Sequence, residues 1–329
     1  MKLLIAYDGS RDADAAIDDL RSCGLPAKIS AEVISVAEVW LPSPESIDGD
    51  GGRESAYVEE IVRESQEKGE KAVTEAQILA GFATGRVKAA FQDWDVAPFA
   101  TYGSPGWEIV NEAERFDADL VLLDAQGQSF LSRLVLGSIS QRVLTEASCS
   151  VRIGRGRIDL DAGPERIVIG FDGSRGANAA VEAVAARNWN EDTEVKLISV
   201  SEPVLPSTIG RFVTPTIRTA EEANVSERVW IEQSAKIAIA KLVDRGLEAT
   251  LQVCSGNPKY LLPDEADKWG ADCIFVGANA WGSRLERFLI GSTSAAVAAR
   301  AHCSVEVIRV GIAAIHSSTD QTGRAGGAA

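Results

Sequence analysis

The chain repeats itself. Residues 5–11 read Ile-Ala-Tyr-Asp-Gly-Ser-Arg and recur as Ile-Gly-Phe-Asp-Gly-Ser-Arg at residues 169–175. Later matches follow in the same order: Ile34-Ser35-Val36 with Ile198-Ser199-Val200, Gly103-Ser104-Pro105 with Gly256-Asn257-Pro258, and Cys149-Ser150-Val151 with Cys303-Ser304-Val305. An ordered series of matches indicates a tandem duplication. Whatever fold the first half adopts, the second half is therefore expected to adopt as well.

Length and composition agree with two folded units. A chain of 329 residues corresponds to about two domains. With 45% hydrophobic and 25% charged residues it resembles an ordinary globular protein, which excludes disorder of the whole chain. The net charge of −15 argues against binding to nucleic acid, and equally against a polybasic membrane surface, because both need clustered Lys and Arg.

Neither export nor membrane insertion is indicated. Apolar runs such as 120–123 and 273–276 are far shorter than the roughly 20 residues of a membrane span. The apolar start of the chain is broken by Asp8, too early for a signal peptide. Five widely spaced cysteines, an odd number, indicate reduced thiols. We expect a cytoplasmic protein that binds neither membranes nor nucleic acid.

Each half alternates short apolar strands with helical segments. Strands are predicted near residues 3–7, 33–36, 120–123 and 151 in the first half, and their counterparts near 167–171, 195–200, 273–276 and 305, with a further strand before each Gly-Ser-Pro or Gly-Asn-Pro. Continuous apolar strands between helices indicate a parallel sheet covered on both faces. The fold class is therefore α/β, with two tandem doubly wound, Rossmann-like domains at residues 1–155 and 165–310. A linker at 156–164 joins them, and a disordered tail is expected at 311–329.

A long helix is expected between the second and third strands of each half. In the second half, apolar residues at helical spacing predict its buried face. These residues are Val225, Val229, Ala235, Ile239 and Leu242.

Ligands of such sheets bind at the carboxyl ends of the strands. Asp8 and Asp172 end the first strands, although Asp-Gly-Ser is equally ordinary turn chemistry. A glycine-containing loop follows each fourth strand and ends in Gly-Ser at a helix start, which can present N–H groups and a hydroxyl to a phosphate. The alternatives are a plain surface connection for this loop and plain core residues for Val36 and Val200, which end the second strands.

Together these segments resemble the universal stress protein family. The combination is a strand followed by Asp-Gly-Ser, a valine ending the second strand, and Gly-x2-Gly-x9-Gly-Ser, and it covers roughly residues 1–153 and 165–310. The resemblance implies domains with five parallel strands. In nucleotide-binding members of the family, ATP is held by the aspartate at adenine, the valine backbone, and the glycine loop at ribose and phosphates.

Carried over position by position, the resemblance implies two nucleotide sites. The first half offers Asp8, Val36, Gly127, Gly137, Ser138 and Ser140. The second half offers Asp172, Val200, Gly277, Gly291, Ser292 and Ser294, with Gly282 standing in for the glycine that Ala280 replaces.

The resemblance also suggests that the halves pair through their fifth strands as an intrachain pseudo-dimer. Both strands would otherwise be exposed edges, and pairing covers both with one contact. It would also bring Arg152 and Glu306, which have opposite charges, to related positions.

Catalytic and metal sites are not predicted. The only histidines are His302 and His316, no His–Cys–carboxylate cluster has ligand spacing, and no P-loop motif is present. The leading hypothesis is a non-catalytic stress-response protein that binds an adenine nucleotide, ATP with or without Mg²⁺, and signals to unidentified protein partners. A homodimer of the tandem chain stays open. The alternatives are a nucleotide-free interaction module and a slow ATPase.

The two sites are expected to differ. Asp124 stands where the first half should have its first loop glycine, whereas the second half keeps Gly277. A carboxylate about 6 Å from a phosphate charge costs roughly 3 kcal/mol at an effective dielectric near 20. If only one site holds ATP, the second is expected to be that site.

Overall fold

The structure is a computed structural model in which residues 1–39, 52–125, 136–156, 164–201, 214–278 and 290–309 are described. The expected linker and tail fall largely or wholly outside these ranges. The first half consists of β1 (Lys2–Ala6), α1 (Arg11–Asp19), η1 (Leu20–Ser22), β2 (Ser30–Ala37), α2 (Gly52–Ala90), β3 (Asp95–Tyr102), α3 (Pro105–Phe116), β4 (Leu120–Asp124), α4 (Ser138–Glu146) and β5 (Ser150–Gly154). The second half consists of β6 (Arg166–Gly170), α5 (Arg175–Ala185), β7 (Glu194–Ser201), α6 (Thr214–Val243), β8 (Glu248–Ser255), α7 (Pro258–Trp269), β9 (Cys273–Gly277), α8 (Ser292–Arg300) and β10 (Ser304–Ile308).

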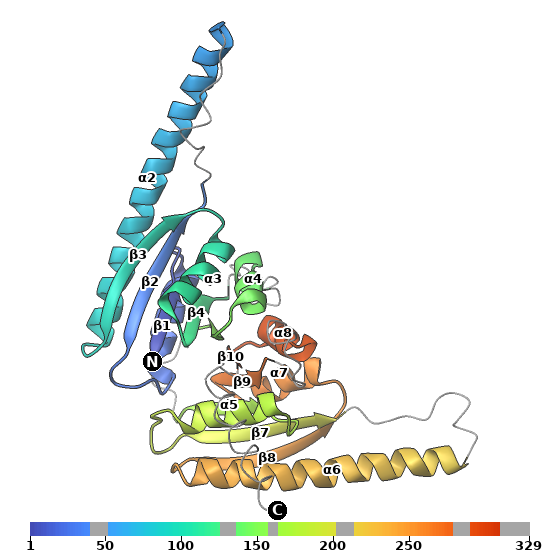
Figure 1. The fold of residues 1–329 in the computed structure, drawn as a ribbon. Coiled ribbons are helices and arrows are strands. Elements are labelled where there is room, and N and C mark those ends of the chain that lie inside the picture. The colour runs from blue at the N-terminus through green and yellow to red at the C-terminus, as the bar shows by residue number, and fades with distance from the viewer. Residues whose placement is uncertain (40–51, 126–135, 157–163, 202–213, 279–289, 310–329) are drawn as a thin grey trace, which may run out of the picture.

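One continuous sheet runs through both halves (Figure 1). Its ten strands lie in the order β3-β2-β1-β4-β5-β10-β9-β6-β7-β8. Within each half all neighbouring strands are parallel, and the two halves meet where β5 pairs antiparallel with β10. The predicted fold of two doubly wound units joined as a pseudo-dimer is confirmed.

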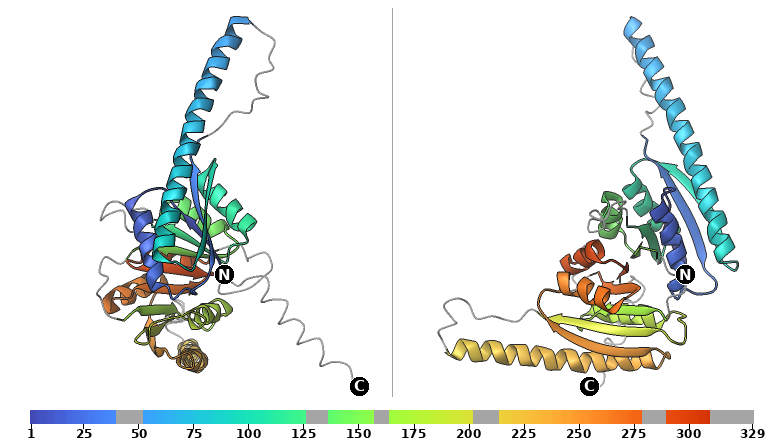
Figure 2. Two further views of the ribbon diagram at one scale, coloured as in Figure 1. Left: turned by 90° about the vertical axis from the view of Figure 1, so that its left-hand side faces the viewer. Right: turned by 180° about the vertical axis from the view of Figure 1, so that it is seen from behind.

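The helices divide the core unequally between the two faces of the sheet. On one face α3, α4, α7 and α8 cover a single hydrophobic cluster that draws residues from both halves, such as Val143 and Val297. On the other face α1 and α2 cover one cluster, and α5 and α6 cover a separate one. The two halves therefore share a core on one side of the sheet only, as the views in Figure 2 help to follow.

A buried chain of charges lies at the β5–β10 contact. The strand register pairs Arg152 with Glu306, as the sequence predicted, and the two side chains are joined by an ion pair of 3.2 Å. Arg152 also contacts Asp19 at 2.7 Å, and Glu306 contacts Arg187. Both Arg152 and Glu306 are only 1% exposed. Each of these four ions contacts at least one ion of opposite charge, and the four charges sum to zero.

Two arginines cross the contact in opposite directions. Arg155 follows β5 and donates to the carbonyl of Ala298 near the end of α8, in the second half. Arg309 follows β10 and donates to the carbonyls of Leu144 and Thr145 near the end of α4, in the first half. Each guanidinium thus satisfies carbonyls that a helix end leaves unpaired, and each does so for the other half.

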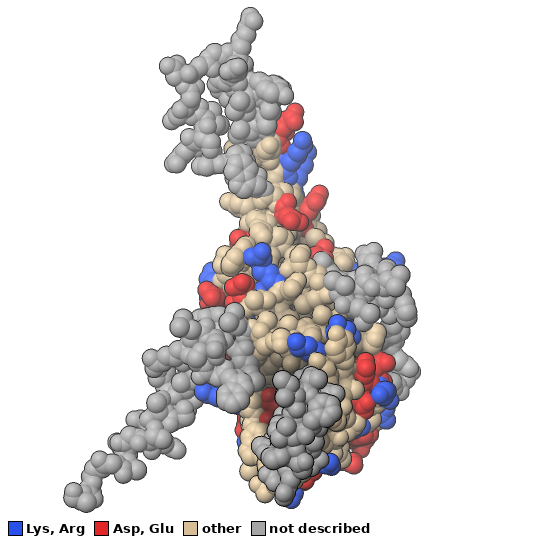
Figure 3. Space-filling view, turned by 90° about the vertical axis from the view of Figure 1, so that its right-hand side faces the viewer, with Lys and Arg blue, Asp and Glu red and all other residues tan. Residues whose placement is uncertain are grey.

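The long helices extend beyond the sheet that they cover (Figure 1). Among the side chains of α6 that the structure describes, from Val225 onward, the first buried one is Ile231 and the last is Leu242. The prediction that Val225 and Val229 belong to the buried face is wrong, because at these residues α6 has passed the sheet, and they are 63% and 47% exposed. The projecting part of α2 carries charges of both signs (Figure 3). None of the described helices has a stretch apolar enough to cross a membrane.

Two carboxylates, Glu32 of β2 and the buried Glu112 of α3, share the guanidinium of Arg115. Arg115 donates to Glu112 at 2.7 Å and lies 3.5 Å from Glu32 of β2. Burial, together with the hydrogen bond and the repulsion from Glu112, raises the pKa of Glu32 to about 7. In the second half the same place in β7 holds Lys196, whose charge helps Lys268 and Gln252 to lower the pKa of Glu265.

Replacing Arg152 with Met is expected to lower the free energy of unfolding by about 3–5 kcal/mol, because buried Asp19 then loses its arginine and Glu306 keeps only Arg187. Urea denaturation measures the change. The matched control is Arg228→Met, which breaks an exposed i,i+4 pair with Glu232 and should cost no more than about 0.5 kcal/mol. Equal effects of the two changes would contradict a structural role for the buried charges.

Glu32 should make the protein less stable as pH rises. The unfolded chain loses this proton near the ordinary pKa of 4.5, and the folded chain keeps it to about 7. The folded state therefore binds the extra proton between these values, so stability falls through this window and the loss persists above it. At pH 8, Glu32→Gln should have a free energy of unfolding roughly 1–3 kcal/mol higher than the parent, measured by urea denaturation. At pH 4 the two proteins should be equally stable. Exposed Glu191→Gln is the control.

Candidate functional site

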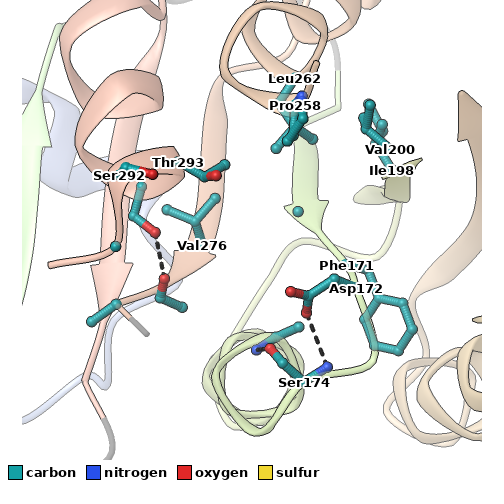
Figure 4. A pocket seen from close by; sticks show the side chains of 16 residues that line it. Phe171, Asp172, Ser174, Ile198, Val200, Pro258, Leu262, Val276, Ser292 and Thr293 are labelled. Carbon is teal, nitrogen blue, oxygen red and sulfur yellow. Dashed lines mark hydrogen bonds between the residues drawn. The ribbon is translucent and has the colours of Figure 1, made fainter. Parts of the chain in front are cut away.

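A cavity opens at the carboxyl ends of β6, β7 and β9 (Figure 4). Its volume is about 330 Å³, and the first turns of α5, α7 and α8 close its sides. It is lined by Gly170, Phe171, Asp172, Ser174, Ala177, Ile198, Val200, Pro258, Leu262, Val276, Gly277, Ala278, Gly291, Ser292, Thr293 and Ser294.

The structure brings together the second-half residues that the sequence analysis singled out. Six of them line this one cavity, although they come from four different parts of the chain: Asp172, Val200, Gly277, Gly291, Ser292 and Ser294. Gly282, the seventh, lies outside the described residues, as does Ala280.

Asp172 holds the turn between β6 and α5. Its Oδ1 accepts the backbone N–H of Ser174 at 2.9 Å, and Ser174 Oγ accepts the N–H of Ala177 at the start of α5. Gly173 between them has φ +71°, a conformation that favours glycine. The turn interpretation of Asp-Gly-Ser therefore applies here, and the carboxylate is at the same time exposed to the cavity.

The helix start after the glycine loop is tied to the end of β9. Ser294 Oγ donates to the carbonyl of Gly277 at 2.6 Å, and Gly291 N–H donates to the carbonyl of Ala278. In the first half Ser140 Oγ makes the same bond to Asp124. Because each serine uses its only proton in this way, Ser140 and Ser294 position the helix and have no hydroxyl proton left for a ligand.

Close packing against α5 requires glycine at position 277, which the sequence alone did not reveal. A Cβ at this position would lie 2.3 Å from the backbone of Gly176 in α5, so no side chain fits. In the first half the glycine under the first helix is instead Gly154 of β5, where a Cβ would lie 2.8 Å from Ala16. Helix and sheet thus approach most closely over different strands in the two halves. This shift explains why the first half tolerates Asp124 where the second half needs glycine.

Two hydroxyls at the start of α8 remain directed to the cavity region. Ser292 is exposed and Thr293 is half-buried, and both line the cavity. Thr293 was not among the residues expected at the site, although the two halves differ visibly here: the second reads Gly-Ser-Thr-Ser where the first reads Gly-Ser-Ile-Ser. The opposite wall is apolar, with Ile198, Val200 and Leu262.

The first-half residues occupy the corresponding strand ends. Asp8 accepts the N–H of Ser10 at 2.9 Å in the same turn, Val36 lies near the end of β2, and Gly137 precedes Ser138 at the start of α4. Gly127 lies outside the described residues. Asp124, only 8% exposed, places a carboxylate at the end of β4. Nowhere in the described ranges do three or more His, Cys, Asp or Glu side chains gather as a metal site would require.

Comparison with known proteins gives one consistent result. The sequence profile described as the universal stress protein family matches residues 1–154 and again residues 164–309. A universal stress protein of Mycobacterium tuberculosis is 24% identical over 327 residues, which cover 93% of this chain and 96% of that protein. A universal stress protein of Bacillus subtilis is 25% identical over 154 residues, 47% of this chain and 98% of its own length.

Solved structures show the same tandem fold. The crystal structure of a universal stress protein from Archaeoglobus fulgidus aligns with a TM-score of 0.55 and 22% identity, covering 95% of this chain and 97% of that one. A functionally unknown protein from Pseudomonas aeruginosa aligns with a TM-score of 0.55 at 14% identity, covering 98% and 97%.

The tight fit under α5 predicts opposite effects for two glycine substitutions. Gly277→Ala should lower the free energy of unfolding by about 1–3 kcal/mol, because α5 must move away from the strand. Gly81→Ala in α2, where a new Cβ meets nothing within 4 Å, should raise it by roughly 0.5–1 kcal/mol. Chemical denaturation of both variants measures the two shifts. A fully stable Gly277→Ala would show that the α5 contact is not tight.

Proposed function

The chain belongs to the universal stress protein family, and on that premise we propose that it is a non-catalytic stress-response protein whose second half binds an adenine nucleotide, ATP. The observation that carries the proposal is the composition of one cavity. It combines an apolar wall, an exposed carboxylate and a hydroxyl-bearing helix start, all at the strand ends where doubly wound sheets bind ligands.

The apolar wall suits the base. Ile198, Val200 and Leu262 offer aliphatic surface against which a planar purine can be buried. The exposed carboxylate of Asp172 accepts hydrogen bonds only, and the exocyclic amino group of adenine is a donor. Guanine presents a carbonyl oxygen in that place, so this arrangement favours adenine.

The start of α8 suits the phosphates. Its first-turn N–H groups have no partner within the helix, and the helix dipole adds a partial positive charge. Ser292 and Thr293 add hydroxyl donors beside them. The described lining residues include no lysine or arginine, so Mg²⁺ would contribute charge that these residues do not supply.

The second half is the better candidate of the two. Thr293 provides a hydroxyl where the first half has Ile139, and Gly277 is uncharged where the first half has Asp124. Both differences favour an anionic ligand in the second half, by one added donor and one absent negative charge.

The same cavity is better suited to holding ATP as a signal than to hydrolysing it. The described lining residues include no histidine, lysine or cysteine to serve as a base or nucleophile, and the one carboxylate, Asp172, already accepts the Ser174 N–H. We expect bound ATP to stay intact and its presence to be detected by protein partners.

A matched pair of charge insertions tests the site. Ser292 and Ser138 are both exposed first residues of equivalent helices. Ser292→Glu places a carboxylate beside the phosphates, at a cost of roughly 3 kcal/mol near 6 Å, and should weaken ATP binding about 100-fold. Ser138→Glu should leave affinity and a stoichiometry near one unchanged. Isothermal titration calorimetry with Mg²⁺ measures both.

Each other outcome assigns a different function. Loss of binding with Ser138→Glu alone would move the site to the first half. No binding by the parent protein, and no nucleotide released from it in mass spectrometry, would make it a nucleotide-free interaction module. Stoichiometric ADP release on incubation with ATP, abolished by Ser292→Glu, would make it a slow ATPase.

A further inference from the structure

An aromatic ring from α6 covers the turn that carries Asp172. Gly173 follows Asp172, and a Cβ added to Gly173 would lie 2.5 Å from Cη2 and 2.7 Å from Cζ3 of Trp230. The far edge of the indole ring therefore lies directly against the backbone of the turn. Trp230 is thus one glycine away from the carboxylate that lines the second-half cavity.

The ring of Trp230 contributes to the turn more than to the core. The hydrophobic cluster beneath α5 and α6 draws Ala235, Ala238 and Leu242 from α6, whereas Trp230 is 50% exposed. Ile231, the next residue along α6, is buried and fixes this part of the helix on the second half. Trp230 is therefore held in place from its own helix and presents its ring to the turn.

The turn needs a second support because its central residue is glycine. Gly173 has φ +71°, a conformation that favours glycine, but glycine is equally free to leave it. Asp172 would then move with the backbone. The hydrogen bond from the Ser174 N–H to Asp172 Oδ1, 2.9 Å long, closes the turn on one side (Figure 4). Trp230 closes it on the other.

The first half makes the same contact from a different position. A Cβ added to Gly9, the counterpart of Gly173, would lie 2.9 Å from Cδ2 of Leu79 in α2. Aligning the buried residues of the two long helices pairs Leu79 with Ser234, not with Trp230. These buried residues are Ala76, Ala80, Ala83 and Val87 in α2, and Ile231, Ala235, Ala238 and Leu242 in α6. Both halves therefore cover the turn, with residues that do not correspond.

We propose that Trp230 positions Asp172 for the base and so sets the preference of the second-half cavity for adenine, an inference that rests on the adenine-nucleotide binding proposed above. Trp230 is not among the described residues that line the cavity, so it acts through Gly173. It holds the turn in the conformation in which one carboxylate oxygen accepts the Ser174 N–H. The other oxygen is then left for the exocyclic amino group of adenine.

Without the ring, the ligand has to order the turn itself. Fixing the backbone of one residue corresponds to a factor of about 5–30 in affinity. This loss falls on ligands that use the Asp172 carboxylate. Contacts made by Ser292 and Thr293 at the start of α8 do not depend on the turn and are spared.

Isothermal titration calorimetry of the full chain with ATP and Mg²⁺ tests this role. Trp230→Ala should raise the ATP dissociation constant about 5–30-fold. Leu79→Ala, which removes the corresponding contact in the first half, should leave the ATP dissociation constant unchanged. GTP carries a carbonyl oxygen in place of the amino group, so Trp230→Ala should change its dissociation constant by no more than about twofold.

A double-mutant cycle identifies the group through which Trp230 acts. Asp172→Asn keeps an oxygen for the Ser174 N–H, but its NH₂ group cannot accept a hydrogen bond from adenine. In that background Trp230→Ala should weaken ATP binding by no more than about twofold. A tryptophan that only supported the fold would weaken binding equally in both backgrounds.

Thermal denaturation separates affinity from folding. Trp230→Ala should leave the melting temperature nearly unchanged, because the hydrophobic cluster beneath α6 stays intact. Trp230→Phe keeps an aromatic side chain but lacks the ring atoms that lie against Gly173. It should show a smaller loss of ATP affinity in the same direction, and it carries the test if the alanine variant unfolds.

The outcomes distinguish this inference from the function on which it rests. ATP binding that neither Trp230→Ala nor Trp230→Phe weakens would overturn the role of Trp230 and leave nucleotide binding intact. So would equal losses for ATP and GTP, an equal loss with Leu79→Ala, or an undiminished effect of Trp230→Ala beside Asp172→Asn. A parent protein that binds no ATP would overturn both proposals.

Discussion

The ion pair between Arg152 and Glu306 governs how the two halves can be joined. Among the strands that the structure describes, it lies at the centre of the only antiparallel pairing in an otherwise parallel sheet, and each side chain is 1% exposed. Charges so deeply buried must be matched, because an unpaired one costs several kcal/mol. Asp19 and Arg187 extend the pair to a neutral chain of four. The register of β5 on β10, and through it the arrangement of every other strand, is tied to this match.

Duplication allowed such a match to arise. Two identical halves would set the same residue against itself at this position, Arg152 against arginine or Glu306 against glutamate. After duplication the two copies could diverge, and here they have taken opposite charges. Each half therefore discriminates against a second copy of itself at β5 or β10 and favours its covalent neighbour. Association between chains is then left to other surfaces.

Much of this arrangement was predictable from the sequence, because each strand and each motif occurs twice, once in each half. Asp172 after β6 and Ser292 at the start of α8 line one cavity, as expected because the carboxyl ends of parallel strands meet at one edge of the sheet. The features that could not be predicted depend on how far apart elements lie in the folded chain. Val225 has the spacing of a buried face, but α6 outruns the sheet there. The packing role of Gly277 depends on how closely α5 approaches, which no local pattern encodes.

The crossing arginines make α8 a mechanical link. Its first turn borders the second-half cavity, and near its last turn the Ala298 carbonyl is held by Arg155, which belongs to the first half. A nine-residue helix is about 13 Å long and nearly incompressible along its axis. A displacement of α8 along its axis at the cavity would therefore also move the Ala298 carbonyl that Arg155 of the first half contacts. In the first half, α4 is joined in the same way to Arg309 of the second half, so the connection exists in both directions.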